Sequence, residues 1–328
     1  MPSIKSEYLL CDDNSLLEEV IESLTDSPTL ILDCEAKDLG SIGGQLSLLN
    51  LGIASSLSTS KPCTEPNHPI FLIDVLAFTK AELRPLYDFL EDPSVLKVVF
   101  DGRQDFSELW HGEGVELKNV IDLQLADITS RSLRGEGQRE QLQRLGRYLK
   151  RDEVNRPDRR SRYTRIHKVC GLEACVREHD FTTVYSGSQA SPDHSKWLSR
   201  PLTASQLSYA ARDISYIDSL YSHFKKMGYI RPSLTQESEE YITLHLDSRP
   251  SSDDRFVRHP LLPLQILDKT AHINPVQCQG CKRTLPPDCF PSHQTPRHRY
   301  RADGTDRENK CFVCSALDYV FRRTRVIW

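Results

Sequence analysis

Short apolar runs and longer amphipathic stretches follow one another along the first two-thirds of the chain. Where apolar residues recur every three or four positions, the pattern is typical of a helix with one buried face. Where an apolar run is short and bounded by glycine, serine or other polar residues, it favours a strand. The predicted strands are Thr29–Asp33, Gln45–Ile53, Pro69–Val75 and Leu96–Phe100, and the predicted helices include Ser15–Leu24, Ala81–Leu90 and Leu207–Met227, which ends at Gly228.

The order of these elements predicts the fold class. Three consecutive strands joined by turns indicate an antiparallel meander. Later strands alternate with helices, because Phe106–Trp110 has a helical pattern and Val120–Leu123 begins another element. An early run of strands followed by such alternation is typical of an α/β fold, in which helices flank a mixed sheet.

The middle and the end of the chain predict further divisions. Residues 131–193 are polar, rich in arginine and weakly patterned, with helices expected at Gln138–Lys150 and Leu172–Glu178. Residues 248–254 have the composition of a linker. We therefore predict a large domain over 1–235 that carries a basic insertion at about 131–193, a linker over 236–270 and a small module over 271–328.

Charge is distributed unevenly along the 328 residues, although the formal net charge is only −4. Residues 139–168 hold eleven Lys or Arg and four Asp or Glu, and residues 255–328 hold thirteen and six. Each segment thus has a net charge of +7, and the other residues of the chain together have a net charge of −18. Two basic segments beside an acidic body fit a polyanion partner held near an acidic, metal-binding centre. Two solvated surface segments explain the charge equally well.

Length and composition describe a globular protein that can bury a substantial core, with 38% hydrophobic and 27% charged residues. No stretch approaches the ~20 apolar residues of a membrane span. The first residues lack the apolar run of a secretory signal. We expect an intracellular protein without membrane contact, in the nucleus or the cytoplasm.

Four acidic residues lie where folding could bring them together. Asp33 and Glu35 are two residues apart at the end of a predicted strand, so both carboxylates project to one face. Asp105 lies just over one turn into the helix that follows strand 96–100. Tyr209 and Asp213 are four residues apart on the long helix and share a face. Each motif is weak by itself, because a solvated strand end or a surface aspartate explains it as well.

Asp101 directly follows a predicted strand and precedes Gln104 by three residues, a spacing typical of a helix N-cap. We favour this capping role over a role as a ligand. The other carboxylates would repel one another unless cations neutralised them. Hard oxygen ligands select Mg²⁺ or Mn²⁺. Two such ions ~3.5–4 Å apart can stabilise the attacking and leaving oxygens of a phosphoryl displacement.

These motifs, in this order, resemble the DEDDy 3′-5′ exonucleases of the RNase D type, and within that family the branch that contains the Egalitarian-like exonuclease-domain proteins. The similarity runs from about Leu16 to Met227, and the long basic insertion is the main departure from it. The resemblance implies a ribonuclease-H-like mixed sheet flanked by helices. The matching pieces are Ile31–Glu35, Gly44–Leu49, Lys97–Asp105, Asn119–Asp122, Trp197–Leu202, Tyr209 and Asp213.

The resemblance also implies roles for individual residues. Tyr209 would orient or help to deprotonate the attacking water, and two Mg²⁺ or Mn²⁺ ions would be held by Asp33, Glu35, Asp105 (directly or through water) and Asp213. The implied reaction is two-metal-ion hydrolysis of single-stranded nucleic acid from its 3′ end, which releases nucleoside 5′-monophosphates. RNA is favoured as the substrate and DNA stays open. Some relatives have lost catalytic carboxylates and act as RNA-binding adaptors, but this chain keeps all four acids and the tyrosine, which favours catalysis.

Five of the ten cysteines crowd the last fifty-odd residues. Two C-x-x-C pairs, Cys278 with Cys281 and Cys311 with Cys314, are separated by 29 residues. Thiolates at this spacing can present both sulfurs to one ion, and two pairs close a tetrahedron around Zn²⁺. We therefore predict one structural Zn²⁺ ion with four cysteine ligands.

The rest of this module admits more than one interpretation. Gly280 would allow the tight turn of the first pair, and Ser315–Arg325 looks helical. Cys289 is interpreted as a packing residue, and weaker alternative ligands are His272, His293 and His298. Contacts to nucleic-acid phosphates could come from Arg299, Arg301, Arg322 and Arg323. Recruitment of a protein partner explains the module nearly as well.

The other five cysteines are scattered along the chain. Small buried hydrophobes are the commonest role of isolated cysteines in a reducing compartment. We assign that packing role to Cys11, Cys34, Cys63, Cys170 and Cys175.

Overall fold

The computed structural model describes residues 8–25, 27–55, 69–149, 151–157, 160–164, 166–180, 192–252, 259–263, 276–290 and 310–324. Its contacts divide the chain into two compact units, each made of two segments. Unit 1 comprises 1–130 and 170–252, and unit 2 comprises 131–169 and 253–328. Among the helices in the described ranges, none has the length and apolar character needed to cross a membrane.

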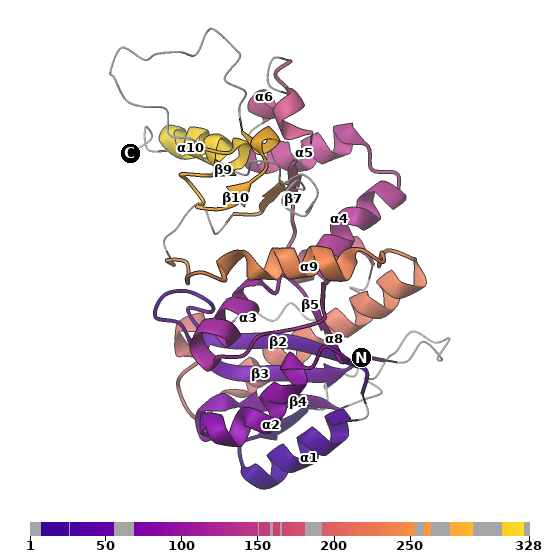
Figure 1. The fold of residues 1–328 in the computed structure, drawn as a ribbon. Helices are drawn as coiled ribbons and strands as arrows, with labels where there is room; N and C mark the ends of the chain where they lie inside the picture. Colours follow the sequence, from indigo (N-terminus) through magenta and orange to yellow (C-terminus); the bar gives the residue numbers. More distant parts are fainter. Residues whose placement is uncertain are drawn as a thin grey trace. The chain divides into compact units, whose positions relative to one another are not determined.

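Unit 1 is built on a six-stranded mixed sheet with the strand order β1-β4-β3-β2-β5-β6 (Figure 1). The central strands β2, β3 and β4 are consecutive and antiparallel, so the predicted meander is confirmed. The other pairings, β1 with β4, β2 with β5 and β5 with β6, are parallel. The strands are β1 (Tyr8–Cys11), β2 (Thr29–Lys37), β3 (Gln45–Ile53), β4 (Ile70–Asp74), β5 (Leu96–Val99) and β6 (Val120–Asp122).

Helices cover both faces of this sheet. On one face, α1 (Asn14–Thr25) and α2 (Lys80–Glu91) bury their apolar stripes in the main core cluster. On the other face, α8 (Ala204–Lys226) packs across β2, β3 and β4. Capping boxes fix the first turns of two helices, with Thr79 and Glu82 at α2 and Thr203 and Gln206 at α8. This layering of helices on a mixed sheet confirms the predicted fold class.

Alternation along β2 decides which residues meet α8. Leu30, Leu32 and Cys34 belong to the core cluster that α1 and α2 share. The residues between them, Asp33 and Glu35 included, therefore point to the opposite face, which α8 covers. α8 approaches this face closely, because a Cβ added at Gly52 would lie only 2.7 Å from Ile214 Cγ2.

Shorter elements complete unit 1. α9 packs on β6 and on α3, with Tyr241 and Ile242 buried, so the predicted linker over 236–270 begins inside a helix that belongs to the core. The 3₁₀ turns are Val75–Ala77, His194–Lys196 and Thr243–His245. The helices are α3 (Arg103–Glu108), the π-helical turn η2 (Leu109–Glu113), α4 (Leu123–Leu133), α7 (Leu172–Glu178) and α9 (Leu234–Ile242).

Unit 2 joins two segments that the sequence placed in separate domains. β7 pairs antiparallel with β8, where Ile166 faces Pro263 and Lys168 faces Leu261, and α10 packs on α5 and β8. The basic segment and the cysteine-rich module therefore form one compact body, unlike the predicted boundaries. The elements are α5 (Gln138–Leu149), α6 (Arg151–Val154), η3 (Arg160–Tyr163), β7 (Ile166–Lys168), β8 (Leu261–Pro263), β9 (Val276–Gln277), β10 (Thr284–Leu285), η9 (Pro287–Cys289) and α10 (Phe312–Thr324).

Candidate functional site

Three elements of unit 1 bring the four predicted acids together. Asp33 and Glu35 lie on β2, Asp105 lies in the first turn of α3, and Asp213 lies on α8. The negative charges of Asp105 and Asp213 act on Asp33, and all three of these aspartates act on Glu35. Residues more than a hundred positions apart in sequence thus form one acidic cluster.

The strand β2 presents its two acids from the interior of the sheet, because it runs on to Lys37 rather than ending at Asp33. Asp33 is paired with Asn50 of β3, and the Asn50 amide Nδ2 donates a 3.2 Å hydrogen bond to Asp33 Oδ2. The register of β2 and β3 shifts immediately after Glu35, a β-bulge of the kind that re-aims side chains next to functional sites.

A hydrogen bond between β2 and α3 positions Asp105. The main-chain N–H of Cys34 donates to Asp105 Oδ1 at 2.8 Å. The turn that leads into α3 is organised by Asp122 at the end of β6, whose carboxylate accepts the N–H groups of Asp101 and Gly102 at 3.0 and 2.9 Å. Asp122 lies within a motif quoted above, but its positioning role depends on contacts across the sheet and was not predicted.

The capping role predicted for Asp101 is wrong. The residue before α3 is Gly102, and it makes no side-chain capping bond. Asp101 has a left-handed backbone (φ 59°), which differs from the extended conformation of an N-cap. Its carboxylate instead accepts both Nε and Nη2 of Arg103, at 2.6 and 2.8 Å. Asp101 therefore fixes Arg103 rather than the helix terminus.

Burial and mutual repulsion make the acidic cluster costly to ionise. Burial, followed by the charges of Asp105 and Asp213, raises the pKa of Asp33 well above its usual value. Burial and the neighbouring aspartates also raise the pKa of Glu35. Burial raises the pKa of Asp105 to about 7 and that of Asp213 to about 6. Buried carboxylates that raise one another's pKa are the kind of group whose negative charge divalent cations neutralise in proteins.

Tyr209 lies at the edge of this cluster, one helical turn before Asp213. Burial, followed by the negative charges of Asp213, Glu35 and Asp33, raises the pKa of the phenol above its usual value. Arg212 lies beside both residues, with its guanidinium carbon 4.8 Å from the centre of the Tyr209 ring and Nη2 3.3 Å from Asp213 Oδ1. The positive charge of Arg212 lowers the pKa of Glu35.

The segment before α8 is attached to the sheet by a partly buried ion pair of Arg200 with Asp74. Arg200 Nε and Nη2 donate to the two carboxylate oxygens of Asp74, each at 2.6 Å. Arg200 Nη2 also contacts Ser47 Oγ at 3.0 Å, and Ser47 Oγ donates to the Trp197 carbonyl at 2.5 Å. These bonds connect β3 and β4 to the entrance of the helix that carries Tyr209 and Asp213.

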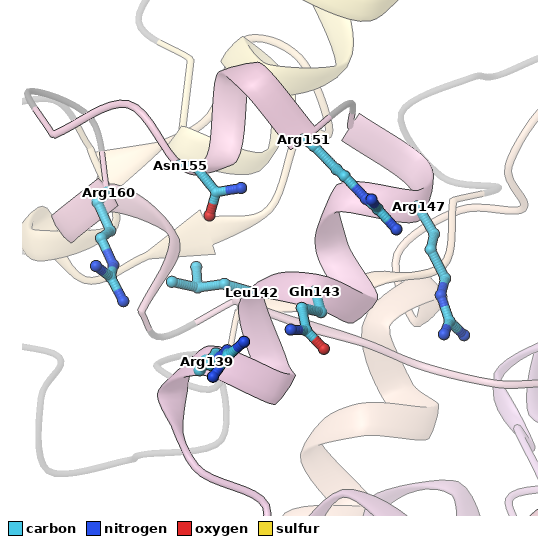
Figure 2. Close-up of a pocket in the computed structure, with 7 residues that line it drawn as sticks. All are labelled: Arg139, Leu142, Gln143, Arg147, Arg151, Asn155 and Arg160. Carbon is cyan, nitrogen blue, oxygen red and sulfur yellow. The ribbon is translucent and has the colours of Figure 1, made fainter.

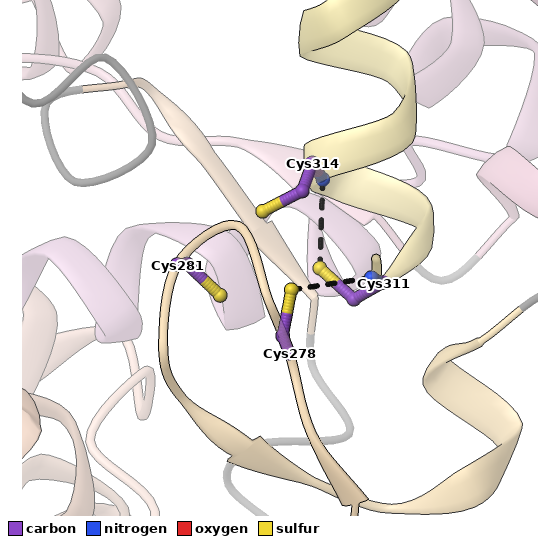
Figure 3. A group of neighbouring side chains, drawn as sticks. All are labelled: Cys278, Cys281, Cys311 and Cys314. Atoms are coloured by element: carbon purple, nitrogen blue, oxygen red, sulfur yellow. Dashed lines mark hydrogen bonds between the residues drawn. The ribbon is translucent and has the colours of Figure 1, made fainter. Parts of the chain in front are cut away.

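The four predicted zinc ligands converge in unit 2 (Figure 3). The Sγ atoms all lie within 4.8 Å of one another in Cys278, Cys281, Cys311 and Cys314. The N–H of Cys311 donates to Cys278 Sγ at 3.3 Å, and hydrogen bonds from the other three thiols lower the pKa of Cys278. Cys314 lies in the first turn of α10, which begins at Phe312, three residues earlier than predicted. The arrangement fits a tetrahedral Zn²⁺ ion.

The first cysteine pair is shaped by Lys282 rather than by Gly280. Lys282 has a left-handed backbone (φ 61°), and its N–H donates to the Cys278 carbonyl at 2.9 Å. Cys289 is 3% exposed, in keeping with the predicted packing role. Arg299, Arg301, His272, His293 and His298 lie outside the described residues, as does Cys63. The side chains of Arg322 and Arg323 are likewise outside them.

Unit 2 also contains a basic pocket of about 360 Å³. Four arginines from α5, α6 and η3 surround it together with two side-chain amides (Figure 2). No described carboxylate lies within ion-pair distance of these four guanidinium groups. The lining residues are Arg139, Leu142, Gln143, Arg147, Arg151, Asn155 and Arg160.

Known proteins resemble this chain in sequence and in fold. Residues 8–145 match the family of the 3′-5′ exonuclease domain. A ribonuclease D from Nitrobacter hamburgensis is 26% identical over 176 residues, which are 52% of this chain. The chain covers 35% of that relative, or about a third of its length.

Solved structures with a similar fold include two from Trypanosoma brucei. RNase D in complex with RNA U12 superposes with a TM-score of 0.51 at 21% identity, over 80% of this chain and 79% of that one. The catalytic core of RRP6, in a mutant form, has a TM-score of 0.50 at 18% identity, over 77% and 57% of the two chains. At such identities the similarity establishes the fold. The family match covers less than half of the chain, so the chain is similar in sequence to 3′-5′ exonucleases over residues 8–145 and to a ribonuclease D over 176 residues.

Proposed function

We propose that this protein is a metal-dependent 3′-5′ exonuclease that hydrolyses single-stranded nucleic acid, with RNA as the preferred substrate, and releases nucleoside 5′-monophosphates. The observation that carries the proposal is the acidic cluster of Asp33, Glu35, Asp105 and Asp213, with the Tyr209 hydroxyl at its edge. The RNA preference is supported by a solved RNase D of the same fold that is bound to RNA.

In this proposal the four carboxylates hold two Mg²⁺ or Mn²⁺ ions. Such a pair, when bound, supplies Lewis-acid stabilisation of the attacking and leaving oxygens. The protein itself holds the carboxylates in position. The bond from Cys34 fixes Asp105 relative to β2, and the Arg200–Asp74 pair fixes the entrance of α8.

Tyr209 has the role of a positioning and proton-handling group. Its raised pKa keeps the phenol neutral at physiological pH, so the hydroxyl is available as a hydrogen-bond donor and acceptor at the reacting phosphate. Arg212 offers a positive charge next to Asp213, where it would attract the phosphate backbone or compensate the cluster between turnovers.

The direct test uses 5′-labelled RNA and DNA oligonucleotides of matched sequence, with Mg²⁺ or Mn²⁺. We expect a ladder that shortens from the 3′ end, faster on RNA, and free nucleoside 5′-monophosphates by chromatography. A 3′-phosphate on the oligonucleotide should block this shortening. A wild-type protein that binds RNA but shortens no substrate would instead support the alternative, an RNA-binding adaptor built on the exonuclease fold.

We further propose that the basic pocket of unit 2 binds phosphates of the nucleic acid. Four arginines without described acidic partners line a space of about 360 Å³, within the roughly 300–1,000 Å³ of common ligand pockets. Planar guanidinium groups contact phosphate oxygens through two donors at once, and the amides of Gln143 and Asn155 add hydrogen-bonding groups at the same rim.

This second proposal is tested by salt-dependent RNA affinity of catalytically inactive protein. Replacing Arg139 and Arg160 by Gln should weaken binding and lower the slope of log affinity against log salt by about 0.7 for each lost phosphate contact. Arg84→Gln removes a matched positive charge from α2, where Arg84 is paired with Asp88, and should leave the slope unchanged. Equal slopes for all three proteins would refute the pocket's role.

Point variants are preferable to removal of residues 255–328. β8 pairs with β7 and α10 packs on α5, so truncation would expose the partners of both elements.

The predicted zinc ion of the four-cysteine site is tested separately. Elemental analysis of the Cys278→Ser/Cys281→Ser variant should show about one zinc fewer per chain than wild type.

A further inference from the structure

A second cluster of metal-ligating side chains lies in unit 1, away from the acidic cluster. One ligand atom from each of Asp127, Cys175 and His179 lies within 4.8 Å of the other two. Cys170 adjoins them, because its thiol donates to Asp127 Oδ2 at an Sγ–O distance of 3.4 Å. Cys175 is fully buried, in keeping with the packing role predicted for it, whereas Cys170 is only partly buried.

The backbone prearranges these four groups. Cys175 and His179 are four residues apart at the end of α7, so they lie on one face of the helix, one turn apart. Cys170 precedes the first residue of α7 by two positions, which gives the spacing C-x₄-C-x₃-H. Asp127 projects from α4 toward them, and His179 Nε2 lies 3.2 Å from Asp127 Oδ1.

Most of the site is buried, and Cys170 is partly exposed. The side chain of Asp127 is 0% exposed and that of His179 is 2% exposed. Phe224 and Tyr229 close it from the side of α8, with ring centres 4.8 and 6.2 Å from that of His179. A divalent cation would bind the three groups whose ligand atoms converge, and Cys170, whose sulfur lies 3.4 Å from Asp127 Oδ2, would supply the fourth ligand.

We propose that Cys170, Cys175, His179 and Asp127 bind a second, structural Zn²⁺ ion, distinct from that of the four-cysteine site. Two thiolates, an imidazole and a carboxylate are a ligand set typical of zinc. Formation of the two zinc–sulfur bonds releases the two thiol protons to solvent, and a neutral imidazole donates the third bond. The four ligands close the coordination sphere, so the ion has a structural role.

The position of the ligands in the sequence indicates what this ion would hold. Unit 1 is interrupted after Ser130 and resumes at Cys170. Asp127 and Cys170 therefore stand next to the two points where the chain leaves unit 1 and returns to it. An ion between them would pin α7 to α4 across the interruption. α7 in turn carries Glu173, whose carboxylate lies 3.4 Å from Arg212 Nη2 beside Asp213.

The proposal is tested on the full-length protein by zinc content after removal of loosely bound metal. We expect about two zinc ions per chain in wild type and about one in each of two variants, Cys278→Ser/Cys281→Ser and Cys175→Ser/His179→Asn. Cys11→Ala is the matched control, since Cys11 is a fully buried thiol whose hydrogen bond goes to a backbone carbonyl. That variant should keep about two.

Cobalt substitution keeps the test decisive where a variant folds poorly. In the Cys278→Ser/Cys281→Ser background, the remaining Co²⁺ should show a thiolate charge-transfer band with roughly half the intensity per ion of a four-thiolate site, because two sulfurs rather than four bind it. Wild type with about one zinc, lost entirely in Cys278→Ser/Cys281→Ser, would overturn the proposal. A Cys170–Cys175 disulfide found by mass spectrometry in the purified protein would overturn it as well.

Discussion

The main-chain N–H of Cys34 donates a 2.8 Å hydrogen bond to Oδ1 of Asp105, so the strand that carries two of the clustered acids is joined directly to the helix that carries a third. Because of this bond, two variants can distinguish the structural role of Asp105 from the role of its negative charge. Asp105→Asn keeps an oxygen acceptor for the Cys34 N–H, whereas Asp105→Ala leaves a buried donor without a partner.

We therefore expect Asp105→Ala to be less stable than Asp105→Asn by about 1–3 kcal/mol, the usual cost of an unsatisfied buried donor. Denaturant unfolding without divalent ions measures the difference. Both variants should lose nuclease activity to the same extent, because both remove the carboxylate. Equal stability of the two would show that the hydrogen bond contributes little.

The raised pKa values predict how the protein without divalent ions responds to pH. The pKa is about 7 for Asp105 and about 6 for Asp213, both above the ordinary 3.8. A carboxyl whose pKa is raised on folding contributes stability that is complete below its unfolded pKa and is lost as pH rises through its folded pKa. Thermal stability should therefore fall between pH 5 and pH 8, relative to Asp105→Asn/Asp213→Asn. Added Mg²⁺ should reduce the loss of thermal stability at pH 8. If the thermal stability of wild type and variant changed with pH in parallel, the raised pKa values of Asp105 and Asp213 would be wrong.

Tyr209→Phe removes the hydroxyl while it keeps the ring that packs near Trp197. We expect kcat to fall about 100-fold, the lower end of the range for the loss of a proton-handling group. Mn²⁺ affinity should change little, because the four carboxylates remain. A variant with unchanged kcat would remove Tyr209 from the reaction, and one with lost Mn²⁺ binding would make it a structural residue instead.

The close approach of α8 to the sheet at Gly52 predicts a steric coupling. A methyl group at this position would lie 2.7 Å from Ile214 Cγ2, so Gly52→Ala should cost about 1–3 kcal/mol. Ile214→Ala leaves a cavity and should cost about 2–5 kcal/mol. In the double variant the new methyl occupies part of that cavity, so the combined loss should be at least about 0.5 kcal/mol smaller than the two losses added. Additive losses in a double-mutant cycle would mean that α8 lies farther from β3.

Local pattern predicted most of the regular elements but not their partners. Helices such as α2 and α8 carry both an apolar stripe and a capping box, and their bounds differ from the prediction by three residues at most. The four-residue β1 was missed, because so short an edge strand has no period of its own. The pairing of β7 with β8 joins residues almost a hundred positions apart through three-residue strands, and no local signal indicates it.

The candidate site shows the same limit at the level of single residues. Spacing indicated the shared face of Asp33 and Glu35, and that of Tyr209 and Asp213. Asp101 misled the prediction because its left-handed backbone and its pair with Arg103 depend on the turn that Asp122 organises from a neighbouring strand. The group around Asp127 was missed for a similar reason, since its aspartate lies 43 residues before Cys170.

The proposed reaction depends on the four carboxylates of β2, α3 and α8 holding a pair of divalent cations. Electron paramagnetic resonance of bound Mn²⁺, with saturating nucleoside 5′-monophosphate, measures this directly. We expect about two Mn²⁺ ions per chain with the exchange-coupled spectrum of neighbouring ions, and at most about one in Asp33→Asn and in Asp213→Asn. Asp218→Asn, which alters the next aspartate along α8, should keep about two. A folded wild-type protein that binds no Mn²⁺, or variants that bind as much as wild type, would contradict the account.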